Sequence, residues 1–90
     1  MRPWTDESIR YRIAAAETGM MEETIARHIG AHLPRDSHVC DAGCGLGHLS
    51  LELASRFCLV TAVDTCQPAL DILIAAKKRR GVGNISIVRE

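Results

Sequence analysis

The chain has 90 residues with a balanced charge, and these properties limit what it can be. A chain of this length buries only about 60–65% of the surface that its unfolded form exposes, so it forms one small domain. Hydrophobic residues make up 47% of the sequence and aromatic residues 3%, so aliphatic side chains must build the core. The 11 Lys and Arg residues balance the 11 Asp and Glu residues, so nucleic acid binding is not indicated.

The sequence also bears on where the protein works. No apolar run approaches the roughly 20 residues that a membrane span needs, and residues 1–7 do not resemble a signal peptide. The four cysteines form no CxxC pair, which favours reduced thiols and a cytoplasmic location. His28 and His32 have a spacing that can bind zinc, but no third ligand is evident, so we expect no metal site.

The first 37 residues are predicted to be a helical leader with two helices. Thr5 can cap the first helix and Gly19 can end it. In the second helix, Met21, Ile25 and Ile29 are four residues apart, so we expect them to form one apolar stripe.

The pattern changes at residue 38 to alternating strands and helices. We expect a strand over 38–40, a helix over 48–56, a strand over 59–63, a helix from 68 to 80 with Leu70, Leu73 and Ile74 as its buried stripe, and a strand over 85–88. The order β-α-β-α-β with short connections predicts parallel strands. Residues 38–90 therefore form an α/β half-domain with a partial parallel sheet of about three strands, preceded by the leader.

A glycine-rich loop follows the first of these strands. Gly43, Gly45 and Gly47 let the backbone turn sharply and let a ligand approach closely. Asp64 ends the second strand, 21 residues after Gly43, where a carboxylate can accept hydrogen bonds from ribose hydroxyls. The pattern predicts a ligand that contains a nucleoside.

The residues around the loop favour one kind of nucleoside ligand. Asp41 precedes the first glycine by two residues, and its carboxylate would repel a pyrophosphate but attract the cationic methionine part of S-adenosylmethionine. The dinucleotide fingerprint also requires Gly or Ala where this chain has His48. We therefore expect S-adenosylmethionine as cofactor. An NAD-type nucleotide-binding module and a non-catalytic Rossmann-like interaction module remain alternatives.

The stretch from 38 to 90 resembles the opening half of class I S-adenosylmethionine-dependent methyltransferases. Residues 39–47 match the first motif of that family, and Val63-Asp64 matches the second. The resemblance implies a Rossmann-like fold and a methyltransferase activity. It also implies that the methionine part is held by Asp41 and the loop containing Gly43, Cys44, Gly45 and Gly47, the ribose by Asp64, and the adenine beside Thr65.

The chain departs from that family in its length. The acidic residue that meets the adenine amine would fall about one position after Glu90, and the fourth strand of the family is absent. The resemblance thus implies the donor-binding portion of an enzyme, inactive by itself. No catalytic residue and no methyl acceptor can be assigned. The edge where the fourth strand would pair is expected to be covered by the remainder of the domain or by a second chain.

Overall fold

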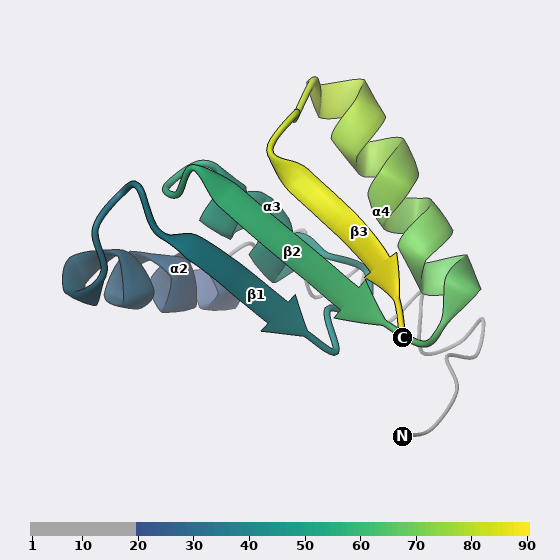
Figure 1. Cartoon of the computed structure of the whole chain (residues 1–90), viewed down its shortest axis with the longest axis horizontal. Helices are drawn as coiled ribbons and strands as arrows, with labels where there is room; N and C mark the ends of the chain where they lie inside the picture. Colours follow the sequence, from purple (N-terminus) through teal and green to yellow (C-terminus); the bar gives the residue numbers. More distant parts are fainter. Residues whose placement is uncertain (1–19) are drawn as a thin grey trace.

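The structure is a computed structural model, and it describes residues 20–90 (Figure 1). The first predicted leader helix lies outside these residues. The elements in chain order are α2 (Met20–His32), β1 (His38–Ala42), α3 (His48–Ala54), β2 (Leu59–Asp64), α4 (Gln67–Arg80) and β3 (Ile85–Arg89).

The three strands form one parallel sheet in the order β1-β2-β3. Val39 of β1 is level with Val60 of β2, which in turn is level with Ile85 of β3. Each strand is followed or preceded by a helix, so the predicted Rossmann-like α/β arrangement is confirmed. Because the strands are parallel, their carboxyl ends meet at one edge of the sheet (Figure 1).

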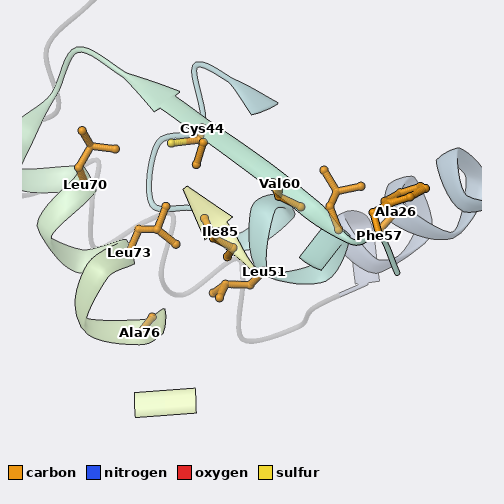
Figure 2. Close-up of a cluster of buried hydrophobic side chains, with 11 residues drawn as sticks. Ala26, Cys44, Leu51, Phe57, Val60, Leu70, Leu73, Ala76 and Ile85 are labelled. Carbon is orange, nitrogen blue, oxygen red and sulfur yellow. The ribbon is translucent and has the colours of Figure 1, made fainter. Parts of the chain in front are cut away.

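Helices α3 and α4 cover the same face of the sheet. Val60 and Ala62 of β2 belong to one buried cluster with Leu51 of α3 and with Leu70 and Leu73 of α4 (Figure 2). This burial removes aliphatic surface from water at about 25 cal/mol per Å², which makes it the main stabilising contribution to the half-domain. The predicted buried stripe of α4 is confirmed for Leu70 and Leu73 and wrong for Ile74. Ala76 takes the third buried position instead. Ile74 is 44% exposed, and Ala76 is buried.

Helix α2 packs on α3 through a line of residues that includes Ile29 of the predicted stripe, but the prediction is wrong for Met21 and Ile25. Met21 and Ile25 are 58% and 41% exposed, whereas Glu22 and Ala26 are buried and Ile29 is half-buried. Compared with the predicted orientation, the buried face of the helix is shifted by about one residue, which brings the small side chain of Ala26 into the core cluster. A small residue allows close packing of the helix, which explains why the larger apolar side chains lie outside the contact.

The opposite face of the sheet carries no helix within residues 20–90 (Figure 1). Leu59, Thr61 and Val63 of β2 are half-buried on alternate positions, and Cys40 and Ser86 of the flanking strands are exposed. Parallel sheets are usually covered on both faces. No helix in this part of the chain combines the length and apolar character needed to cross a membrane.

Candidate functional site

The glycine-rich loop connects β1 to α3 and folds over the end of β2. Gly43, Gly45 and Gly47 have φ angles of 71°, 57° and 83°. The backbone N–H groups of Gly43 and Cys44 both donate to the carbonyl oxygen of Val63, at 2.7 and 2.9 Å. These bonds fix the loop at the carboxyl edge of the sheet, which is where open α/β sheets bind ligands.

Gly47 is the position where the loop becomes helix, and only glycine fits there. It is the N-cap residue of α3, and its φ of 83° disfavours every residue that has a Cβ atom. A Cβ atom at this position would lie 2.8 Å from Cγ of Leu73 and closer still to its methyl groups. The glycine therefore sets both the backbone conformation and the close approach of α4 to the loop.

Asp64 binds the loop to the end of β2. The residue is buried, with 2% of its surface exposed. Oδ2 accepts a hydrogen bond from the backbone N–H of Gly45 at 2.9 Å, and Oδ1 accepts one from the N–H of Cys66 at 2.9 Å. A carboxylate oxygen can accept more than one hydrogen bond, so these contacts leave acceptor capacity. The sequence predicted a ribose acceptor at this residue, and the structure adds that the same carboxylate organises the loop.

Asp41 lies in β1 and is half-buried. The hydroxyl of Ser50, a fully buried residue of α3, donates to Oδ2 of Asp41 at 2.6 Å. Sequence reasoning missed Ser50, because a serine inside a helix with leucines on either side gives no signal of a contact with a strand. The bond connects the first carboxylate of the motif to the helix that follows the loop.

The pKa of Cys44 reflects the negative charge around the loop. Burial and, after it, the negative charges of Asp41 and Asp64 together raise the pKa of its thiol from 9.0 to about 12. Cys44 as a residue is 8% exposed. Two carboxylates therefore act on the same buried loop, and a cationic ligand group is favoured there over an anionic one.

The remaining predicted residue, Thr65, follows Asp64 at the same edge of the sheet and is exposed. Its carbonyl oxygen accepts a hydrogen bond from Nε of Arg89 at 3.3 Å. The backbone N–H of Glu90 donates to the carbonyl oxygen of Asp64 at 3.0 Å. The structure thus brings all the predicted site residues to one edge, namely Asp41, Gly43, Cys44, Gly45, Gly47, Asp64 and Thr65.

Two other features of the sequence lie away from this edge. The imidazole rings of His28 and His32 are 4.8 Å apart on α2, and residues 20–90 contain no group of three side chains suited to hold a metal ion. The basic end of α4 is partly engaged, because Nζ of Lys77 donates to the carbonyl oxygen of Ile85 at 2.6 Å. Arg79 and Arg80 line an open cavity of about 280 Å³ between α3 and α4, which Leu46 of the loop also lines.

Comparison with known proteins assigns the chain to a family. Residues 39–90, more than half of the chain, match a sequence profile described as a methyltransferase domain. This match includes the loop and both carboxylates described above. No curated protein matches the chain.

Solved structures share the fold. A proposed S-adenosyl-L-methionine-dependent methyltransferase of Methanococcus maripaludis is 20% identical, with a TM-score of 0.81 over 100% of this chain and 45% of that protein. Coclaurine N-methyltransferase, bound to N-methylheliamine and SAH, is 26% identical, with a TM-score of 0.69 over 77% of this chain and 22% of its own. Precorrin 8W decarboxylase of Methanobacterium thermoautotrophicum is 30% identical, with a TM-score of 0.65 over 77% and 38%. The chain therefore spans less than half the length of each of these proteins.

Proposed function

Since the chain belongs to the methyltransferase domain family, we propose that it is the donor-binding portion of an S-adenosylmethionine-dependent methyltransferase. The observation that carries this proposal is the placement of Asp41 and Asp64 around one glycine-rich loop. Their combined charge, which acts on Cys44, suits a ligand with an ammonium and a sulfonium group. It opposes the pyrophosphate of NAD, which is the chief alternative ligand.

Each site residue has a role in this proposal. The carboxylate of Asp41 binds the ammonium group of the methionine part, and the backbone from Gly43 to Gly47 lies against the rest of that part. Asp64 accepts hydrogen bonds from the ribose hydroxyls with the lone pairs that Gly45 and Cys66 leave unused. Thr65 lies beside the adenine. The α/β half-domain, residues 38–90, holds all of these groups, and residues 1–37 form its leader.

In this proposal, the donor-binding portion contributes to the reaction by binding and aligning the methyl donor. S-adenosylmethionine supplies an already activated methyl group, because the sulfonium is a good leaving group in an in-line displacement. The residues of this chain orient the donor and exclude water from one side of it. The nucleophile of the acceptor and any base that takes its proton come from outside these 90 residues, so the chain alone is expected to be inactive.

Other parts of the full protein would cover the sheet. The strand β1 has a free edge among the described residues, and one face of the sheet carries no helix there. Free strand edges pair readily with other chains, and parallel sheets are usually buried on both faces. We infer that the remainder of a longer methyltransferase domain covers this edge. A second chain is the alternative, and light scattering would then show a dimer of the 90-residue chain.

We propose a cytoplasmic location, and the state of the thiols supports it. Cys40, Cys44, Cys58 and Cys66 are all free. Free thiols on the surface are typical of reducing compartments, which supports the proposed cytoplasmic location.

Asp41→Asn tests the proposed ligand. The substitution keeps the size of the side chain and removes its charge, so calorimetry should show binding of S-adenosylhomocysteine weakened by about tenfold, the loss of one charged hydrogen bond. The control is Asp36→Asn at an exposed position in the connection before β1. Unchanged affinity in Asp41→Asn, or tighter binding of NADH than of S-adenosylhomocysteine by the unaltered chain, would contradict the proposal.

A further inference from the structure

We propose that Ser50 is a positioning residue, which orients the carboxylate of Asp41 toward the ammonium group of the donor. The inference rests on the proposed function. Ser50 is 0% exposed, and its hydroxyl donates to Oδ2 of Asp41 at 2.6 Å. Because the side chain is buried and bonded to Asp41, it would act on the donor only through that carboxylate.

The hydroxyl of Ser50 has an uncommon partner for a serine in a helix. Such hydroxyls usually bond to a backbone carbonyl one turn earlier in the same helix. Here the hydroxyl reaches from α3 to β1, across the loop that separates the two elements. A buried hydroxyl without a partner costs free energy, and the distance of 2.6 Å is in the range of charge-assisted bonds. An alanine would suit the helix better, so the helix alone does not explain a serine here.

The bond fixes which oxygen of Asp41 remains for a ligand. Ser50 occupies Oδ2, and within residues 20–90 no hydrogen bond engages Oδ1. Helix α3 begins directly after Gly47, where the backbone N–H of Leu51 donates to the carbonyl oxygen of Gly47 at 2.9 Å. Ser50 is therefore held in the first turn of α3. The loop, the helix and the carboxylate form one rigid unit, in which Oδ1 is directed by the bond at Oδ2.

The experiment compares two ligands that differ in the part that Asp41 binds. S-adenosylhomocysteine carries the amino acid moiety, and 5′-methylthioadenosine has the adenosine and the sulfur without it. In Ser50→Ala, calorimetry of the 90-residue chain should show about tenfold weaker binding of S-adenosylhomocysteine. The reason is that a carboxylate of Asp41 that is no longer oriented loses its charged hydrogen bond to the ammonium group of the ligand. Binding of 5′-methylthioadenosine should stay within about twofold of the unaltered chain, because only the contact through Asp41 is lost.

Two controls separate positioning from packing. Ser55→Ala removes a hydroxyl at the other end of α3, where Oγ donates to the carbonyl oxygen of Glu52 at 2.7 Å, and should change neither affinity. In the Asp41→Asn background, Ser50→Ala should have no further effect on S-adenosylhomocysteine, since the residue acts through the missing carboxylate. If Ser50→Ala does not fold, Ser50→Cys keeps the volume with a weaker donor and should show the same difference between the ligands.

The outcomes are distinct. Equal losses of affinity for both ligands would mean that Ser50 only packs the helix. Unchanged affinity for S-adenosylhomocysteine would mean that Asp41 needs no orientation. Either result overturns the inference and leaves the proposed function standing. If the unaltered chain binds neither ligand, the proposed function fails and the inference fails with it.

Discussion

The carboxylate of Asp64 accepts a hydrogen bond from the backbone N–H of Gly45, 19 residues earlier in the chain, at 2.9 Å. The other oxygen of the same carboxylate accepts from the N–H of Cys66, the N-cap residue of α4. A single side chain at the end of β2 thus joins the loop before α3 to the first turn of α4. Any ligand that Asp64 binds meets a carboxylate that has already been fixed by the protein.

Asp64→Asn is expected to destabilise the half-domain as well as weaken ligand binding. One of the two buried backbone N–H groups would face the amide NH₂ in place of an oxygen, so unfolding in urea should show a loss of about 2–3 kcal/mol. Asp71→Asn is the matched control, because Asp71 is exposed and accepts only a surface bond from Gln67. Equal stability of the two variants would contradict the role of Asp64 in holding the loop.

Three glycines allow the strain at Gly47 to be separated into its two causes. Gly47→Ala combines a positive φ with overlap against Leu73, so it should lower the free energy of unfolding by about 3 kcal/mol or more. Gly81 has a φ of 65° with open space around it, so Gly81→Ala should lower the free energy of unfolding by about 1 kcal/mol. Gly83→Ala has neither feature, and should lie within about 0.5 kcal/mol of the unaltered chain. Thermal or urea unfolding measures all three, and any other order would refute the steric account.

The thiols should react with iodoacetamide in a fixed order. Cys44 is buried and its pKa is raised to about 12, so at pH 8 its thiolate is about a thousandfold scarcer than that of a thiol with the usual pKa of 9. Cys40 and Cys58 are exposed and should be labelled first. Mass spectrometry of the labelled chain checks this order. Rapid labelling of Cys44 in the folded chain would show that the loop opens readily.

The same thiol gives a pH dependence with a definite sign. Below pH 9 both the folded and the unfolded chain keep the proton on Cys44. Between about 9 and 12 the unfolded chain loses this proton while the folded chain keeps it, so the free energy of unfolding falls as the pH rises. In urea unfolding at pH 8 to 10.5 this fall should be smaller in Cys44→Ala. The same slope in both chains would contradict the raised pKa.

Asn84 directly precedes β3 and bonds to the last residue of α3 and to the turn after that helix. Its Nδ2 donates to the carbonyl oxygens of Ala54 and Phe57 at 2.8 and 2.9 Å. Asn84→Ala should lower the free energy of unfolding by about 1–3 kcal/mol, the cost of leaving such groups unpaired. Asn84→Asp should lower it more, because a carboxylate would face two carbonyl oxygens. Gln67→Ala, which removes a surface bond, serves as the control, and an Asn84→Asp chain as stable as Asn84→Ala would argue against this bonding.

Within residues 20–90 the sequence was sufficient for the order of the elements, because apolar runs and glycine positions act locally. It predicted β1 as residues 38–40, but the strand continues to Ala42, since it pairs with β2 up to Val63. It predicted α3 to end at 56, but the helix ends at Ala54, where the chain turns at Ser55. Such differences depend on partners that are distant in the sequence.

The buried face of α2 and the contacts of the carboxylates were beyond sequence reasoning. The spacing of Met21, Ile25 and Ile29 fits an apolar stripe, yet the packing surface of α3 accepts the line through Ala26. The roles of Ser50 and of Gly45 as donors to Asp41 and Asp64 depend on three-dimensional proximity. Residue types at the site could be predicted, whereas the bonds that orient them could not.

An NMR titration of the 90-residue chain with S-adenosylhomocysteine, with NADH as the control ligand, tests whether this loop binds the methyl donor. We expect saturable binding of S-adenosylhomocysteine, with the largest shifts in the amide signals from Gly43 to Gly47 and at Asp64, and little response to NADH. A folded chain that shows those shifts with NADH, or none with S-adenosylhomocysteine, would contradict the assignment of this loop as a methyl-donor site.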